Sequence, residues 1–127
     1  MNSTLGSVVV VDDEPDILDL LCSLLEDEGY TVVCLRHPVL TDDLAGVEPK
    51  PRLFMLDIML PAMSGIHLAR KLRQDGYKDT PMIAMSASSS MLHAAQSALF
   101  QHVLGKPFDL DAVLHAVAHQ VQTTESP

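Results

Sequence analysis

Five short apolar runs recur along the chain, and polar or turn-forming residues follow each of them. The runs are rich in aliphatic and β-branched residues and cover positions 8–11, 31–35, 53–56, 81–85 and 102–104. Continuous apolar runs of this length are typical of strands that are covered on both faces of a parallel sheet. The pattern therefore predicts five buried strands.

Between these runs, apolar residues recur at a spacing of three to four, which is the period of an amphipathic helix. Such segments cover 17–25, 66–72, 91–100 and 110–121, and a short helix is predicted near 41–44. Pro15 suits a first helical turn, and the acidic residues before it can cap free amide groups. Gly29 is placed to end the first helix.

Strands that alternate with helices predict right-handed crossovers and a doubly wound α/β sandwich, with helices on both faces of a parallel sheet. A length of 127 residues is close to the commonest size of one domain. Residues 1–122 are predicted to form that domain, and residues 123–127 a C-terminal tail or the start of a linker.

Charge and composition exclude several classes of partner. Seventeen acidic and eight basic residues give a net charge of −9, which disfavours direct binding to nucleic acid or to an anionic membrane. No apolar run approaches the length of a membrane span, so a cytoplasmic location is expected. Cys22 and Cys34 lack metal-binding spacing and are expected to be buried free thiols.

Polar side chains with distinct chemistry follow the predicted strands. Asp12 and Asp13 follow the first, Asp57 the third, Ser86 the fourth and Lys106 the fifth. In doubly wound folds, ligands bind outside these carboxyl ends. Three neighbouring carboxylates repel one another and need a cation. The predicted cofactor is Mg²⁺ or Mn²⁺, a hard ion that shares its site with phosphate.

The other two side chains suit a phosphoryl group. Lys106 offers a fixed positive charge, and Ser86 offers a hydroxyl that can donate to a phosphoryl oxygen. Phosphoryl transfer needs charge neutralisation and one oxygen nucleophile in line, and a carboxylate can be that nucleophile. The pattern thus indicates a site for phosphoryl transfer.

Four motifs in this order resemble the receiver domain family of response regulators. They are residues 9–14 (VVVDDE), residues 56–61 (LDIMLP) with Gly65, residues 85–87 (MSA) and residues 106–108 (KPF). The resemblance spans nearly the whole chain. It implies a flavodoxin-like (βα)5 fold with strand order 2-1-3-4-5, and a phosphoprotein that acts in two-component or phosphorelay signalling.

The resemblance also implies a role for each acidic residue. Asp57 would be the phosphoacceptor. Asp13 and Asp57 would bind the metal directly, Asp12 would act largely through bound water, and Met59 would contribute its backbone carbonyl.

By the same resemblance, Ser86 would contact the phosphoryl group and Ala87 would leave room above it. Lys106 would pair with Asp57 and then with the phosphoryl group, and Pro107 would follow a cis peptide bond. The chain would be a signalling switch rather than a conventional enzyme.

The resemblance names classes of partner only. A histidine kinase or a histidine phosphotransfer protein would donate the phosphoryl group, and an unidentified partner or output domain would respond. The signal would leave through the face formed by residues 91–100, 102–104 and 110–121, which could also bind a second copy of the chain.

Two features depart from the family pattern. Val103 replaces the usual aromatic residue, and the stretch from Ser86 to Lys106 is about two residues short. Residues 88–100 also contain no Asp, Glu, Lys or Arg. We therefore expect an altered surface there, and a coupling to output that does not use the usual aromatic rotation.

Two other functions stay open at this stage. One is a degenerate receiver that binds partners without phosphorylation, although none of its key residues is lost. The other is a phosphatase of the haloacid-dehalogenase type, which needs an acid where this chain has Met59. His115 and His119 are spaced for metal binding on one helix face, but the sequence indicates no third ligand.

Overall fold

The computed structural model describes residues 7–37, 50–61, 63–96 and 99–125. The strands are β1 (Ser7–Val11), β2 (Thr31–Leu35), β3 (Pro51–Asp57), β4 (Met82–Ser86) and β5 (His102–Gly105). The helices are α1 (Pro15–Asp27), α2 (Gly65–Gln74), α3 (Ser89–Gln96) and α4 (Leu110–Glu125). The short helix predicted near residues 41–44 lies outside the described residues.

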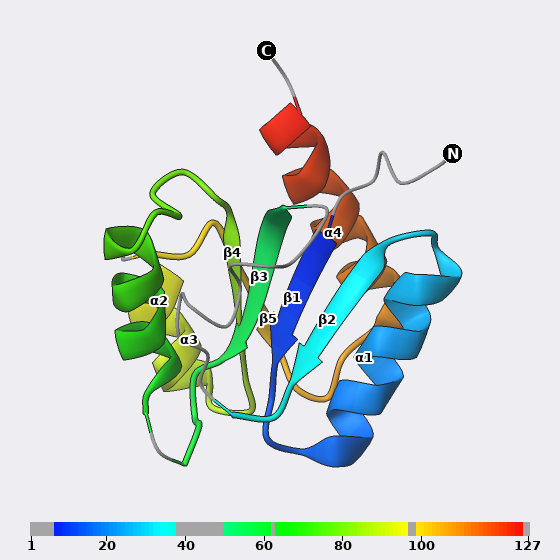
Figure 1. Cartoon of the computed structure of the whole chain (residues 1–127). Helices are drawn as coiled ribbons and strands as arrows, with labels where there is room; N and C mark the ends of the chain where they lie inside the picture. The colour runs from blue at the N-terminus through cyan, green and yellow to red at the C-terminus, as the bar shows by residue number, and fades with distance from the viewer. Residues whose placement is uncertain (1–6, 38–49, 62, 97–98, 126–127) are drawn as a thin grey trace.

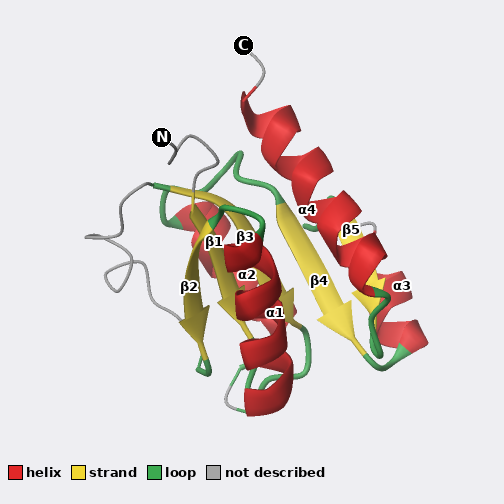
Figure 2. Cartoon of the chain, turned by 90° about the vertical axis from the view of Figure 1, so that its right-hand side faces the viewer, coloured by secondary structure: helices red, strands yellow, loops and turns green. Residues whose placement is uncertain are grey.

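All five strands are parallel and form one sheet in the order β2-β1-β3-β4-β5. Helices α2 and α3 cover one face of this sheet, and α1 and α4 cover the other, as Figure 1 shows. The predicted doubly wound sandwich and its strand order are therefore confirmed. Figure 2 shows the strands side by side across the view, with β2 at the left edge.

The two-sided core explains why the strands read as continuous apolar runs. Along β1, Val9 and Val11 pack into the cluster that contains the α2 side chains, and Val8 and Val10 pack into the cluster that contains α1 and α4. Neighbouring side chains of a strand point to opposite faces, so both sets must be apolar. Burial of each such side chain contributes about 1.5–3 kcal/mol.

The boundaries of α3 differ from the prediction. The helix begins at Ser89 rather than at position 91, because the Ser88 hydroxyl accepts a hydrogen bond from the Met91 amide at 3.3 Å and so caps the first turn. It ends at Gln96, and Phe100 is instead buried just before β5. At the other end of the chain, α4 continues through residues 123–125, which the sequence places in the tail.

The two cysteines form a disulfide, so the expectation of buried free thiols was wrong. Cys22 lies on α1 and is buried, whereas Cys34 lies on the edge strand β2 and is exposed. Gly29, at a φ of 100°, turns the chain back after α1, so that β2 runs alongside the helix. The two Cα atoms are thereby brought to 6.5 Å.

Arg73, near the end of α2, ties two connecting segments to the sheet. Its guanidinium donates hydrogen bonds to the backbone carbonyls of Tyr77, Lys78, Thr80 and Leu99 and to the side-chain oxygen of Gln101. That same Gln101 oxygen accepts a bond from the Met82 amide at 2.8 Å. One side chain thus joins residues 99 and 101, just before β5, to the segment that leads from α2 to β4.

Replacing Arg73 with Ala is expected to destabilise the domain by about 2 kcal/mol, because several partly buried carbonyls lose their donor. Urea denaturation followed by circular dichroism measures the change. Arg70→Ala, an exposed position on the same helix, is the control and should alter stability by less than about 0.5 kcal/mol. Equal stability of the two variants would contradict this role for Arg73.

Candidate functional site

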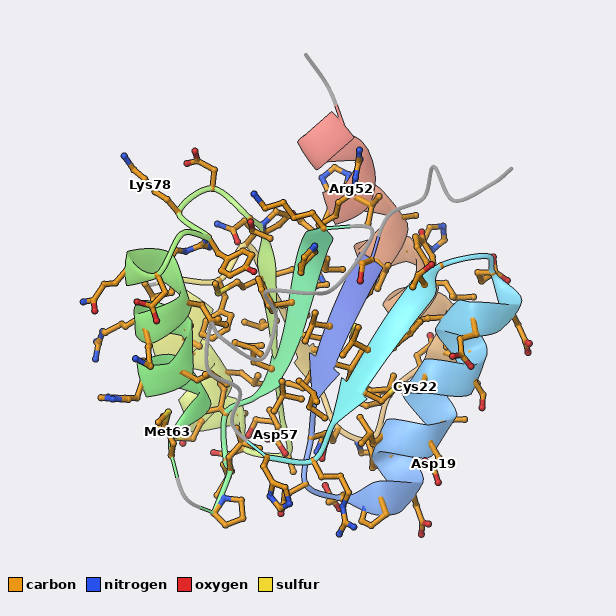
Figure 3. All side chains as sticks on the ribbon, in the orientation of Figure 1. Asp19, Cys22, Arg52, Asp57, Met63 and Lys78 are labelled. Carbon is orange, nitrogen blue, oxygen red and sulfur yellow. A yellow bond between two sulfur atoms is a disulfide. The ribbon has the colours of Figure 1, made fainter. Side chains whose placement is uncertain are left out.

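The strand register brings the predicted site residues to one edge of the sheet. Val11 of β1 pairs with Leu56 of β3, so Asp12 and Asp57 follow at neighbouring positions on adjacent strands. Figure 3 shows Asp57 at the arrowhead end of β3. On the other side, Ser86 of β4 pairs with Gly105 of β5. Lys106 comes next, and its amide donates to the Ser86 carbonyl at 2.9 Å.

Three carboxylates converge at the centre of this edge. Asp12, Asp13 and Asp57 each offer an oxygen within 4.8 Å of the others. Asp12 is fully buried and Asp57 is 4% exposed, while Asp13 is half-buried. Oxygen ligands with this excess of negative charge suit a hard divalent cation that keeps some of its water. The donor set therefore fits the predicted Mg²⁺.

Lys106 is the cation that contacts these acids in the structure. Its Nζ lies 2.8 Å from Asp12 Oδ2, 2.8 Å from Glu14 Oε1 and 3.1 Å from Asp57 Oδ2. Burial by itself would lower the pKa of Lys106, but the contacts with Asp12 and Glu14 and the charges of Asp12 and Asp57 raise it above its usual range. Lys106 is thus fully charged at neutral pH.

Glu14 is the contact that the sequence did not reveal. It precedes α1 as its N-cap residue, yet its side chain makes no capping hydrogen bond and reaches Lys106 instead. Its amide donates to Asp12 Oδ1 at 2.9 Å. The expectation that the acids before Pro15 cap the helix through their side chains does not apply to Glu14.

The Asp57 carboxylate is disfavoured by its surroundings and held by two donors. Burial raises its pKa above 3.8, and the neighbouring charge of Asp12 raises it further. The Met59 amide, 3.0 Å from Oδ1, and the Lys106 ammonium act in the opposite direction without overcoming that effect. The site therefore holds an ionised carboxylate at a cost in stability, which a second cation would reduce.

A cavity of about 220 Å³ opens beside these groups. It is lined by Asp13, Glu14, Asp57, Met59, Ser86, Ala87 and Lys106. The Ser86 side chain is buried, and its oxygen accepts a hydrogen bond from the Ser88 amide at 3.0 Å. Its hydroxyl hydrogen remains available as a donor. The Met59 side chain points outward and is 59% exposed, which leaves only its backbone to serve the site.

The structure thus brings every predicted site residue to this edge. The Lys106–Pro107 peptide bond is cis, as the resemblance implied. Within the described ranges, no helix has the combination of length and apolar composition needed to cross a bilayer.

Lys106→Met is expected to destabilise the domain by about 2–3 kcal/mol at neutral pH, because Asp12 and Asp57 would be left buried without their counter-charge. The loss should shrink as the pH falls through the raised pKa of Asp57, since its protonated carboxyl no longer needs a counter-charge. Urea denaturation at neutral pH and at acid pH measures this loss of stability. A loss independent of pH would contradict the electrostatic explanation.

Comparison with known proteins agrees with this fold. The family model for the response regulator receiver domain matches residues 8–118. The chain therefore belongs to the receiver domain family of response regulators, which act in two-component signalling. Receiver domains are signalling domains rather than conventional enzymes, and they bind Mg²⁺ at an acidic pocket.

Two curated relatives are transcriptional regulators. The DNA-binding dual master transcriptional regulator RpaA of Synechocystis sp. is 31% identical over 121 residues, which cover 93% of this chain and 50% of that protein. The transcriptional regulatory protein YxdJ of Bacillus subtilis is also 31% identical over 121 residues, which cover 93% of this chain and 51% of that protein. The chain thus spans about half the length of these relatives.

Among solved structures, the response regulator TrrA of Thermotoga maritima, in complex with Mg²⁺ and BeF, superposes with a TM-score of 0.77. It is 28% identical, and the match covers 91% of this chain and 98% of that one.

Proposed function

We propose that the chain accepts a phosphoryl group on the Asp57 carboxylate in a reaction that depends on Mg²⁺. The observation that carries this proposal is the buried Asp57 carboxylate beside Asp12 and Asp13, with Lys106 Nζ 3.1 Å from its Oδ2. The donor would be the phosphohistidine of a histidine kinase or of a histidine phosphotransfer protein.

In the transfer, an Asp57 oxygen forms a bond to phosphorus as the bond between phosphorus and the donor imidazole nitrogen breaks. That nitrogen keeps the electron pair and takes up a proton. Lys106 is placed to balance the charge of the transferred group, and the Ser86 hydroxyl can donate to one of its oxygens. The side chain of Ala87 is small enough to leave this space open.

Asp12, Asp13, Asp57 and the Met59 carbonyl would hold the metal, with Asp12 acting largely through water. When bound, Mg²⁺ would neutralise the charge that the phosphoryl oxygens bring to the three carboxylates. The Mg²⁺ and BeF in the name of the TrrA complex support an equivalent site here, because TrrA is more than a quarter identical over nearly the whole domain.

The new dianionic group would compete with Asp12 and Glu14 for Lys106 and would attract Ser86. Movement of these side chains would shift the loops after β3 and β4 and alter the face formed by α3, β5 and α4. Val103 is half-buried against the core in place of an aromatic residue, so the coupling would not use an aromatic rotation.

An output domain or a separate partner would respond to this signal. A second copy of the chain, bound through the same face, is a further candidate. The lengths and names of the curated relatives favour an output domain that acts in transcription. A cytoplasmic location is the corresponding expectation. A phosphatase is disfavoured because Met59 offers no acid or base at the position that such enzymes need.

The proposal is tested by incubating the purified chain with acetyl phosphate, with Mg²⁺ and with chelator, and recording the intact mass. We expect a gain of one phosphoryl group with Mg²⁺ and none with chelator. No gain under either condition would favour a receiver that acts without phosphorylation. Release of phosphate at a constant rate, with no phosphorylated chain detected, would favour the phosphatase.

A further inference from the structure

A second cavity lies between β5 and α4 and shares no lining residue with the cavity beside Asp57. It has a volume of about 310 Å³ and is lined by His102, Ala112, His115, Ala116, His119 and Gln120. Half of these residues are histidines, although the chain contains only six. None of the described lining residues is Lys or Arg, so no fixed positive charge opposes a cation there.

Two of the histidines come from one face of α4. His115 and His119 are four residues apart in this helix, which places their side chains on adjacent turns. Ala112 and Ala116 share that face, and their small side chains leave the space beside the imidazoles open. A pair of histidines at this spacing is a known arrangement for a transition metal on a helix.

The third histidine is supplied by tertiary structure. His102 begins β5, the edge strand beside β4, and is exposed. Side chains alternate along a strand: Val103 packs with the α2 and α3 cluster, and Leu104 packs with the α4 residues. His102 has the parity of Leu104, so it faces α4. This explains why it lines the same cavity as His115 and His119.

We propose that His102, His115 and His119 bind a divalent transition-metal ion of the Zn²⁺, Ni²⁺ or Co²⁺ class through their imidazole nitrogens. Neutral imidazole is the ligand that these ions favour, and three protein ligands with water in the remaining position form an ordinary zinc site. Asp111, one turn before His115 on α4, adds a nearby negative charge that favours a cation.

The site assembles when the metal binds. Among the described residues, Asp12, Asp13 and Asp57 are the group of three whose ligand atoms already lie within 4.8 Å, so the histidines must rotate to converge. The side chains of His102 and His115 are exposed, and exposed side chains exchange rotamers within nanoseconds. Ordering three side chains costs conformational entropy, so we expect an affinity in the micromolar range rather than that of a buried structural zinc.

The bound ion would clamp α4 to the start of β5, within the face through which the proposed function sends its signal. Metal binding at this place does not require phosphorylation. It therefore stands or fails independently of the chemistry at Asp57.

Calorimetric titration of the untagged chain with ZnCl₂ tests the site. The titration is run in excess Mg²⁺, which competes at the carboxylates, and without reductant, so that the Cys22–Cys34 disulfide offers no free thiol. We expect one Zn²⁺ per chain. His102→Ala, His115→Ala and His119→Ala should each weaken binding by roughly 10-fold or more, since the loss of even an outer partner of a metal ligand costs about 10- to 100-fold.

His67→Ala, an exposed histidine on α2, is the matched control and should bind Zn²⁺ like the wild type. Unchanged circular dichroism spectra would establish that the variants fold. Absence of binding, or binding that Mg²⁺ abolishes, would overturn the proposal. A His102→Ala variant that binds like the wild type would also overturn it, because the site would then be a two-histidine chelate on the helix alone.

Discussion

Asp57→Asn is expected to abolish phosphoryl uptake from acetyl phosphate while leaving the domain folded. The asparagine amide is not a nucleophile under these conditions, yet its oxygen can still accept the hydrogen bond that the Met59 amide donates to Oδ1. Lys106 keeps two carboxylate partners, Asp12 and Glu14. The variant therefore loses the chemistry and the hydrogen bond from Lys106 to Oδ2, but it keeps the hydrogen bond from the Met59 amide.

The same substitution is expected to raise the melting temperature by a few degrees at neutral pH. Burial raises the pKa of Asp57 in the folded chain, so folding disfavours its ionised form. The stability that protonation of Asp57 provides is present below the unfolded pKa and is lost as the pH rises through the folded pKa. A neutral amide avoids this cost, so the gain should be largest at neutral pH and vanish in acid.

Asp19→Asn is the control, because Asp19 is an exposed acid on α1. It should take up phosphoryl as the wild type does and melt at nearly the same temperature. The two measurements are intact mass after incubation with donor and Mg²⁺, and thermal unfolding without donor. A clear fall in the melting temperature of Asp57→Asn would contradict the account of Asp57 as a destabilising charge.

Gly65→Ala is expected to destabilise the domain strongly, and far more than the same substitution at Gly105. A Cβ at position 65 would lie 2.3 Å from the backbone oxygen of Asp57 and 2.7 Å from the Cα of Ile58. Both are backbone atoms, so no flexible side chain can move aside. The Gly65 amide also donates to the Ile58 carbonyl at 2.8 Å, which fixes this close approach.

The cost is steric rather than conformational, because Gly65 is not among the glycines with a positive φ. We expect a destabilisation of about 3 kcal/mol, the upper part of the range for overpacking, with a fall in melting temperature of roughly 10 °C. The added methyl group would displace the backbone of Asp57, which carries the proposed nucleophile. The rate of phosphorylation should therefore also drop.

Gly105→Ala is the matched control. A Cβ there would meet only a side-chain carbon of Leu92 at 3.7 Å, which is an ordinary contact. Thermal unfolding and the rate of mass gain from acetyl phosphate measure both variants. If Gly65→Ala were as stable and as readily phosphorylated as Gly105→Ala, the close approach of α2 to β3 would matter for neither stability nor phosphorylation.

The strands and their ends could be predicted because both depend on local pattern. Runs such as Val8 to Val11 are apolar at every position because both sheet faces are covered, and topology then places the residues after each strand at one edge. The predicted site residues follow from this rule and from the resemblance. The start of α3 was missed because it depends on a serine cap rather than on apolar spacing.

Contacts between distant segments could not be predicted in this way. Glu14 reaches Lys106 across 92 positions of the chain, and nothing in the spacing of either residue indicates it. The pairing of Cys22 with Cys34 depends on how β2 returns along α1. The role of His102 depends on which side of an edge strand faces α4. Each of these contacts depends on the tertiary structure.

Locating the phosphoryl group tests directly whether Asp57 is the phosphoacceptor. The chain is phosphorylated with acetyl phosphate and Mg²⁺ and reduced with borohydride, which converts an aspartyl phosphate to homoserine, and its peptides are then sequenced by mass spectrometry. We expect homoserine at position 57 and aspartate at positions 12 and 13. Homoserine at position 12 or 13, or aspartate retained at position 57 in a phosphorylated chain, would contradict it.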